Sequence, residues 1–162
     1  MGCGKTRVGK ALANEMKRPF VDVDEQIVKK AGMSISDIFA KYGEAYFREL
    51  ETKELKEVLE NKEQMIIASG GGIPMQEANL PLLKEGIVVY IEASTEVLLP
   101  RLERDKKRPI LQGGDLCEKI TSLMEVRGPV YEEISDIKIA TTNEAVIKIV
   151  QQIVEKLVEK NV

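Results

Sequence analysis

The sequence predicts an α/β fold built around a parallel sheet, in a single domain that covers residues 1–162. Two features of the chain lead to this class. Short runs of apolar, mostly β-branched residues recur along the sequence, and longer segments with the periodicity of amphipathic helices separate them. Because 43% of its residues are apolar, the chain can also bury a hydrophobic core.

Four apolar runs are expected to form strands. FVDV occupies residues 20–23, and MIIA at 65–68 leads directly into a run of glycines. IVVYI at 87–91 and IKIA at 137–140 complete the set. Nearly continuous apolar runs are typical of parallel strands that helices cover on both faces. The sequence therefore predicts a sheet between two helical layers.

Helical patterns lie between and after these strands. Residues 6–16 form a segment without an internal proline, and residues 44–61 place their apolar side chains near helical spacing. Residues 143–160 carry their apolar side chains on one stripe, with Asn143 as the expected N-cap. Strands that alternate with helices in this way predict parallel β-α-β units.

Composition excludes several classes of function. The 24 basic and 27 acidic residues leave a formal charge of −3, which gives no reason to expect nucleic acid or an anionic membrane as a partner. The sequence has no histidine, so histidine-based acid–base chemistry is excluded and a zinc site is not expected. Two cysteines cannot build a secreted disulfide framework. Without a signal-peptide pattern, a cytoplasmic location is expected.

The residues GCGKT at positions 2–6 match the last part of the phosphate-binding motif GxxxxGKS/T. Gly2 and Gly4 would leave backbone N–H groups free to point at phosphate oxygens. Lys5 would reach the β- and γ-phosphates of a nucleotide, and the Thr6 hydroxyl would bind Mg²⁺. A chance turn before a helix would give the same short match, so the motif needs support from elsewhere in the chain.

Two further motifs follow predicted strands. Asp22 and Asp24 lie at the end of the first predicted strand. Alternation in an extended chain would put both carboxylates on the same side of it. There they could bind a water of Mg²⁺ and a substrate hydroxyl. The alternative is that Asp24 caps the next helix. Residues 69–72, SGGG, are expected to lay their backbone against a ligand. The alternative there is an ordinary flexible turn.

Basic residues supply the remaining candidates. Arg48 has Glu44 and Glu51 at i−4 and i+3 on a predicted helix, so it forms either a surface ion pair or an oriented fork for a substrate carboxylate. The basic run that starts at Arg101 leads into an irregular loop, which is either a solvated face or a lid over nucleotide phosphates. A helix is expected to end at Arg127, just before Gly128 and Pro129.

In this order, GCGKT, DVD, FRELE, SGGG, RDKKRPIL and RGPVYEE resemble the shikimate kinase family, and the resemblance covers the chain nearly from end to end. It implies a three-layer P-loop kinase fold whose parallel sheet has the strand order 2-3-1-4-5. It also implies substrate-binding helices at about 25–61 and a lid at about 106–116. The implied reaction is phosphorylation of the shikimate 3-hydroxyl by ATP with Mg²⁺, which gives shikimate 3-phosphate and ADP.

The resemblance also implies a role for each matching residue. Lys5, Asp24 and Arg108 would act in catalysis, Thr6 and Asp22 would hold the metal, and Glu51 would orient Arg48. The implied ATP-binding residues are Gly2, Cys3, Gly4, Lys5, Thr6, Arg7, Arg101 and Arg108. The implied shikimate-binding residues are Asp24, Arg48, Gly70, Gly71, Gly72 and Arg127.

The N-terminus departs from the family pattern. In the family the strand before the phosphate loop is the first strand and the central one of the sheet, whereas this sequence begins at Met1, inside the loop motif. Losing a central strand would expose apolar faces and unpaired backbone on both neighbouring strands. A domain has a net stability of only ~5–15 kcal/mol, so such a loss would be decisive. We therefore expect that the start of the protein was assigned at an internal methionine or that the chain was shortened. A complete chain of this sequence would be expected to fold poorly and show little activity.

Two other functions fit the same motifs. One is a P-loop kinase for another small hydroxy acid, such as gluconate. The other is a degenerate nucleotide-binding domain without turnover. ATP and shikimate are the expected partners, with no nucleic acid and no membrane, and the family resemblance implies a monomer.

Overall fold

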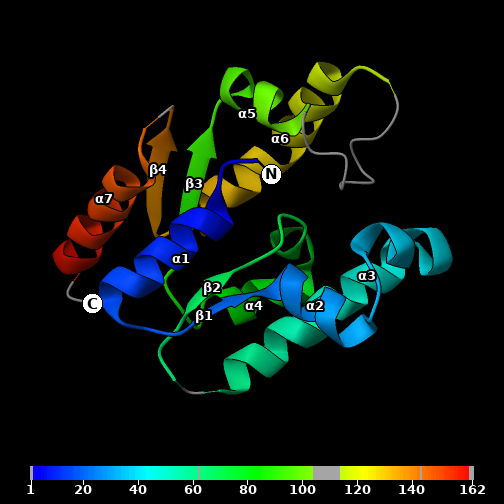
Figure 1. Ribbon diagram of the computed structural model, residues 1–162, viewed down its shortest axis with the longest axis horizontal. Helices are drawn as coiled ribbons and strands as arrows, with labels where there is room; N and C mark the ends of the chain where they lie inside the picture. The colour runs from blue at the N-terminus through cyan, green and yellow to red at the C-terminus, as the bar shows by residue number, and fades with distance from the viewer. Residues whose placement is uncertain (1, 62, 104–113, 143, 161–162) are drawn as a thin grey trace.

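The computed structural model describes residues 2–61, 63–103, 114–142 and 144–160, which fold into an α/β structure with parallel strands (Figure 1). In chain order the elements are α1 (Lys5–Met16), β1 (Phe20–Asp22), α2 (Val23–Ala31), α3 (Ile35–Glu60), β2 (Ile66–Ala68), the 3-10 turns η1 (Ile73–Met75) and η2 (Glu77–Asn79), α4 (Leu80–Leu83), β3 (Val89–Ala93), α5 (Thr95–Leu102), α6 (Leu116–Ile134), β4 (Ile137–Thr141) and α7 (Val146–Glu159).

The four expected strands are present with small shifts at their ends, and the shift in β1 matters for the site. β1 ends at Asp22 because that side chain caps α2, where Asp22 Oδ1 accepts from the backbone N–H groups of Asp24 (3.0 Å) and Glu25 (3.3 Å). Asp24 therefore lies in the first turn of a helix. The expectation that Asp22 and Asp24 share one side of a strand is wrong, and Asp22 rather than Asp24 is the cap.

The strands form two separate parallel pairs. In one pair Phe20 of β1 is in register with Ile66 of β2, and in the other Val89 of β3 is in register with Ile137 of β4. Within the described part of the chain, no strand joins β2 to β3. In the predicted order 2-3-1-4-5 the same two pairs are neighbours, the second strand with the third and the fourth with the fifth.

A hollow of about 750 Å³ lies between β2 and β3, and we call it the inter-sheet hollow. Apolar side chains from two strands and two helices line most of it: Ile66, Ile67, Val89, Ile91, Val8, Leu12, Met16, Ile153 and Leu157. The isoleucines and valine of β2 and β3 that face it are only half-buried, whereas Ile139 on β4 is 2% exposed. Among the described residues, helices rather than strand pairing hold the two pairs together.

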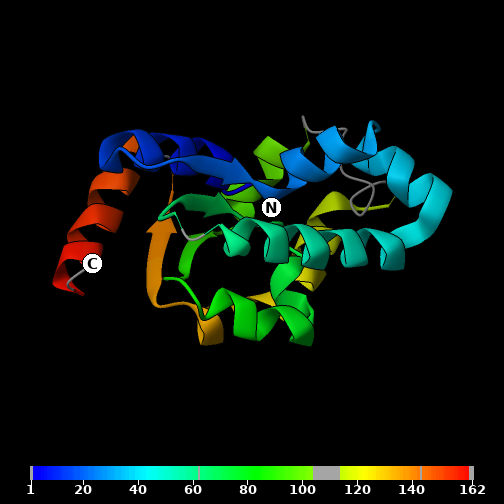
Figure 2. The same ribbon diagram turned by 90° about the horizontal axis from the view of Figure 1, so that it is seen from below.

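Helices cover both faces of the strands. α1 packs against α7 through a core cluster that includes Val8, Leu12 and Val150, and Figure 2 shows α1 and the short α4 on opposite sides of the strands. The stripe expected in residues 143–160 forms the buried face of α7. The expected cap Asn143 lies outside the described residues, and Ala145 occupies the N-cap position. No described helix combines the length and apolar character that crossing a membrane would require.

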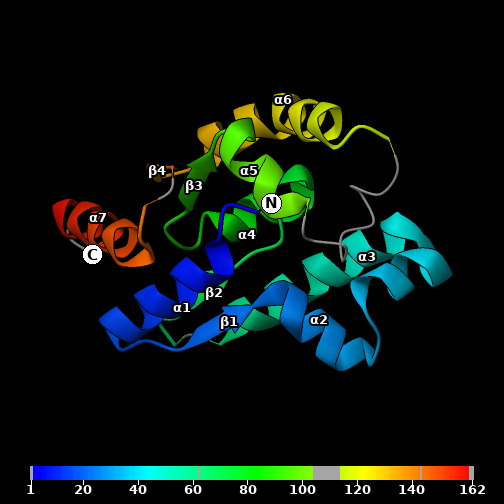
Figure 3. The same ribbon diagram turned by 45° about the horizontal axis from the view of Figure 1, so that its top comes forward.

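Two long helices frame the site, and both differ from expectation. α3 is two helical pieces that meet at Gly43, whose φ of 84° and ψ of 171° interrupt the helix. The second piece covers residues 44–60 of the predicted segment 44–61. α6 runs straight through Gly128 and Pro129, so the expectation that Arg127 ends a helix is wrong. Pro129 lies on an exposed face, where water can satisfy the carbonyl that loses its partner. Figure 3 shows α3 and α6 on either side of the segment that enters α1.

Candidate active site

The phosphate loop enters α1 through two glycines with left-handed backbone. Gly2 has a φ of 67° and Gly4 a φ of 89°, and Gly4 occupies the N-cap position of α1. A side chain at Gly2 would also meet Leu102 Cγ at 3.0 Å. Lys5 then begins the helix, so the loop presents a helix N-terminus, where unpaired N–H groups and the helix dipole attract anions.

Thr6 and Asp22, the two candidate metal residues, are in direct contact. The Thr6 hydroxyl donates to Asp22 Oδ2 at 2.7 Å, and Asp22 is 5% exposed. The other Asp22 oxygen caps α2, so the carboxylate is fixed at both ends. The described residues contain no cluster of three or more His, Cys, Asp or Glu that could hold a metal ion without further ligands. A cation at this position would need oxygens from a bound nucleotide.

The glycine run packs against charged side chains that come from distant parts of the chain. A Cβ added at Gly70 would lie 2.9 Å from Asp24 Oδ1 and closer still to Glu51. A Cβ added at Gly72 would overlap the Arg48 guanidinium. A side chain at Gly70 or Gly72 would therefore have to displace these charged groups from their present positions. The run is therefore a packed surface rather than a flexible turn.

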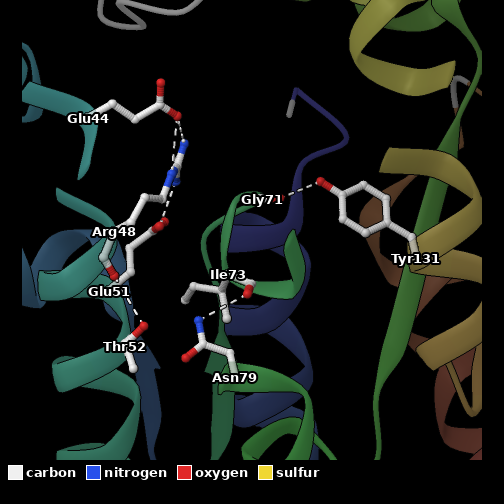
Figure 4. A network of polar contacts seen from close by, with 8 residues as sticks. All are labelled: Glu44, Arg48, Glu51, Thr52, Gly71, Ile73, Asn79 and Tyr131. Atoms are coloured by element: carbon white, nitrogen blue, oxygen red, sulfur yellow. Dashed lines mark hydrogen bonds and ion pairs between the residues drawn. The ribbon is translucent and has the colours of Figure 1, made fainter. Parts of the chain in front are cut away.

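Arg48 is held by two carboxylates on its own helix, as Figure 4 shows. Its Nη1 donates to Glu51 Oε2 at 2.6 Å, and its Nε and Nη2 donate to Glu44 Oε1 at 3.2 and 2.8 Å. The Arg48 side chain is 13% exposed and that of Glu51 only 1%. The pair with Glu51 is therefore buried, unlike the surface ion pair that was the alternative interpretation, and it fixes where the guanidinium lies.

Burial dominates the electrostatics of Glu51. Desolvation raises the pKa of Glu51 above its ordinary value, and the negative charge of Asp24 adds to the rise. The hydrogen bond and positive charge of Arg48 act in the opposite direction but do not cancel it. The negative charge of Glu51 therefore depends on Arg48, and removing the arginine would leave a buried carboxylate without its main partner.

Arg127 and Tyr131 approach the glycine run from the opposite side. Arg127 is 8% exposed on α6, and a Cβ added at Gly71 would lie 3.4 Å from Arg127 Nη1. One helical turn later, Tyr131 donates its hydroxyl hydrogen to the Gly71 carbonyl at 2.6 Å (Figure 4). Burial raises the pKa of Tyr131 more than the positive charge of Arg127 lowers it, so the hydroxyl stays protonated at neutral pH.

Lys5 shares a cavity with the glycine run. The cavity has a volume of about 120 Å³, and its lining includes Cys3, Lys5, Gly70, Gly71 and Tyr131. The structure thus brings Lys5, Asp24, Arg48, Arg127 and the three glycines to one place, although they are far apart in sequence. Arg108 and nearly all of the predicted lid lie outside the described residues.

The other candidate nucleotide residues lie at the edge of this region. Arg101 donates to the carbonyl oxygens of Gly2 (3.3 Å) and Thr142 (3.1 Å), so it ties the phosphate loop to the end of β4. Arg7 is exposed in the first turn of α1. Cys3 is half-buried and is a free thiol.

Sequence reasoning missed two residues, one that bonds to the glycine run and one that bonds to the turn directly after it. One is Tyr131, which stands four residues after Arg127 and therefore on the same helix face, a relation hidden by the expected helix break. The other is Asn79, which is completely buried and whose Nδ2 donates to the Ile73 carbonyl at 3.0 Å. Nothing in the local sequence distinguishes Asn79 from an ordinary turn residue.

Comparison with known proteins identifies the relatives of this chain. The family model described as shikimate kinase matches residues 1–158. A shikimate kinase of Sulfurihydrogenibium sp. is 40% identical over 97% of this chain and 93% of its own length. That of Enterococcus faecalis is 42% identical over 98% of this chain and 95% of its own length.

Solved structures agree with the sequence comparisons. A shikimate kinase from Acinetobacter baumannii in complex with shikimate superposes with a TM-score of 0.95 at 38% identity, covering 99% of this chain and 89% of that one. Shikimate kinase from Aquifex aeolicus gives a TM-score of 0.85 at 36% identity, with 100% and 94% coverage. The predicted fold and enzyme class, a phosphotransferase, are confirmed by these matches. The family model, the relatives and the structures all extend over nearly the whole sequence, and the chain belongs to the shikimate kinase family.

Proposed function

We propose that the protein transfers the γ-phosphoryl group of ATP to the 3-hydroxyl of shikimate, in a site built by Lys5, Asp24, Arg48, Arg127 and the glycine run. The observation that carries this proposal is the convergence of two arginines and an aspartate on Gly70–Gly72, beside the lysine of the phosphate loop. A hydroxylated carboxylic acid needs both kinds of group, cations for its carboxylate and an acceptor for its hydroxyl.

Arg48 and Arg127 are the proposed carboxylate grip. They belong to different helices, and Arg127 lies next to Gly71 whereas Arg48 lies next to Gly72, so a carboxylate between them would be held in one orientation. Arg48 is already oriented by Glu51, which reduces the entropy lost when it binds a ligand. A fixed carboxylate fixes the ring, and the reaction with ATP then becomes effectively intramolecular.

Asp24 is the proposed acceptor for the reacting hydroxyl. Its carboxylate lies against Gly70, in the first turn of α2. In the proposed step the 3-hydroxyl oxygen bonds to the γ-phosphorus, the bond from that phosphorus to the bridging oxygen of ADP breaks, and the proton passes to Asp24. Phosphoryl transfer depends on position and charge neutralisation more than on covalent help.

The nucleotide side of the site would neutralise phosphate charge. Lys5 and the N-terminus of α1 provide positive potential for the β- and γ-phosphates. The paired hydroxyl and carboxylate of Thr6 and Asp22 fit Mg²⁺, which takes oxygen ligands from one or two side chains and from phosphates. When bound, Mg²⁺ would withdraw charge from the transferred group. Cys3, Arg7 and Arg101 are proposed to border the nucleotide, and Arg108 to approach it from the lid.

The remaining proposals concern partners and location. We propose that the protein acts as a monomer, as the resemblance to the shikimate kinase family implies, and that it works in the cytoplasm. We propose that it binds neither nucleic acid nor a membrane, because a formal charge of −3 favours neither of these partners.

An assay of ADP release tests the proposed function against its two alternatives. The protein is incubated with ATP and Mg²⁺ together with shikimate, with gluconate, or without an acceptor. We expect ADP release that depends on shikimate. Release that depends on gluconate would indicate the other small-molecule kinase, and no acceptor-dependent release would indicate a nucleotide-binding domain without turnover.

A further inference from the structure

We propose that Tyr131 is a positioning residue that aims a backbone N–H of the glycine run into the active site. The inference rests on the proposed function, because the N–H would serve the substrate or the transferred phosphoryl group. Tyr131 itself is not expected to touch either. Its hydroxyl acts on the peptide unit between Gly71 and Gly72.

The geometry of one peptide unit carries the inference. Tyr131 holds the Gly71 carbonyl oxygen at 2.6 Å. Because a trans peptide is planar, the Gly72 N–H of the same unit points in the opposite direction. The Gly71 side of the run faces Tyr131 and Arg127, and the Gly72 side faces Arg48. Fixing the carbonyl toward α6 therefore turns the Gly72 N–H away from α6.

The Gly72 N–H is available for this purpose. The backbone hydrogen bonds of the turn run from Ile73 N–H to the Gly70 carbonyl (3.1 Å) and from Met75 N–H to the Gly72 carbonyl (3.0 Å). Within the described residues these bonds give the Gly72 N–H no backbone acceptor. A buried donor without a partner costs about 1–3 kcal/mol, and a bound oxygen would remove that cost.

Tyr131 is itself rigidly placed. Its ring packs against Tyr90 of β3 with centroids 5.3 Å apart and planes tilted by 51°. The residue stands one turn after Arg127 on α6, so the same helix places the arginine and orients the peptide. Glycine has no side chain to restrict its peptide, so without the hydroxyl the Gly71–Gly72 unit could rotate more freely.

The first arm of the test is kinetic and uses Tyr131→Phe with Tyr90→Phe as its matched control. Both variants lose one hydroxyl from the same ring pair, but only Tyr131 bonds to the glycine run. For Tyr131→Phe we expect kcat with shikimate to fall about tenfold, with the KM for ATP and the melting temperature nearly unchanged. Tyr90→Phe should behave as the wild type. Equal losses in both variants, or wild-type kcat in Tyr131→Phe, would overturn the inference.

The second arm needs no turnover. In protein labelled with ¹⁵N-glycine, the amide signal of Gly72 should shift or broaden in Tyr131→Phe, while the signals of the distant Gly32 and Gly86 stay in place. Tyr90→Phe should leave the Gly72 signal nearly unchanged. If wild-type protein shows no shikimate-dependent ADP release, the proposed function fails, and the amide signal still decides whether Tyr131 orients the peptide. An unchanged Gly72 signal in Tyr131→Phe would refute the positioning role.

Discussion

The proposed shikimate side of the site and the proposed nucleotide side are built differently. On the proposed shikimate side, Arg48 and Glu51 form a contact of 2.6 Å within α3, and Tyr131 on α6 forms a contact of 2.6 Å with Gly71 of the glycine run. On the nucleotide side, the loop is tied by Arg101 to Gly2 at 3.3 Å and borders the inter-sheet hollow, which Lys5 helps to line. The difference teaches that Arg48 and Tyr131 are held by polar partners of their own, whereas the backbone of the phosphate loop, which precedes the Thr6–Asp22 contact of 2.7 Å, depends on how well the strands support it.

The largest effect is expected at Lys5. Lys5→Ala removes the side-chain cation of the phosphate loop, so kcat should fall about 10²–10³-fold, as when a preorganised charge-stabilising donor is lost. Shikimate binding, measured by calorimetry without nucleotide, should remain close to that of the wild type. A large loss of shikimate affinity would show that the two sides are not separable in the way their contacts suggest.

Arg48→Ala should produce the opposite pattern. Losing one arm of the carboxylate grip should raise the Kd for shikimate about 100-fold, because a buried charged contact is worth about 2–5 kcal/mol. ATP binding should be nearly intact. The control is Lys53→Ala on the exposed face of the same helix, where the side chain is 74% exposed and no change is expected. Equal loss of ATP and shikimate binding in Arg48→Ala would contradict the role assigned to it.

Because of the inter-sheet hollow, substituting two neighbouring isoleucines should lower the unfolding free energy by different amounts. Ile139→Ala on β4 removes a fully packed side chain and should cost about 3 kcal/mol of unfolding free energy. Ile91→Ala on β3, which faces the hollow, should cost only about 1 kcal/mol because its side chain already lacks neighbours on one side. Urea unfolding of both variants measures the difference. Equal costs would mean that the hollow is filled in solution.

The smallest expected effect is a pH dependence at Glu51. Because the pKa of Glu51 is raised in the folded state, the folded protein holds this proton more tightly than the unfolded chain does. Its contribution to stability is complete below the unfolded pKa of about 4 and is lost as the pH rises through the folded pKa. Glu51→Gln removes this dependence. The unfolding free energy of the wild type relative to the variant should therefore fall as the pH rises, and a constant difference would contradict the pKa direction.

The strands and the loop could be predicted from sequence because their signals are local. The apolar runs that became β2 and β4 and the GKT of α1 each specify structure within a few residues. The end of β1 could not be predicted in the same way, because Asp22 can continue a strand or cap a helix. In the structure Asp22 caps α2, where it accepts hydrogen bonds from the Thr6 hydroxyl and from backbone N–H groups of α2.

The contacts of the charged residue Arg48 could be predicted from sequence, whereas those of the supporting residues Tyr131 and Asn79 could not. Arg48 has both of its expected carboxylate partners because i−4 and i+3 neighbours must meet on a helix. Tyr131 was missed because Gly128 and Pro129 favour a helix break locally, whereas α6 continues through both residues and brings Tyr131 to Gly71. Tertiary contacts decided that point, and they also placed Asn79 in the core.

The central claim is that Arg48 and Arg127 grip the same carboxylate across the glycine run. A double-mutant cycle of Arg48→Ala and Arg127→Ala on the Kd for shikimate, measured by calorimetry, tests it most directly. Two groups that share one ligand charge should show a coupling energy of about 1–2 kcal/mol. Losses that add to within about 0.3 kcal/mol would show that the two arginines act at independent places and would contradict the account.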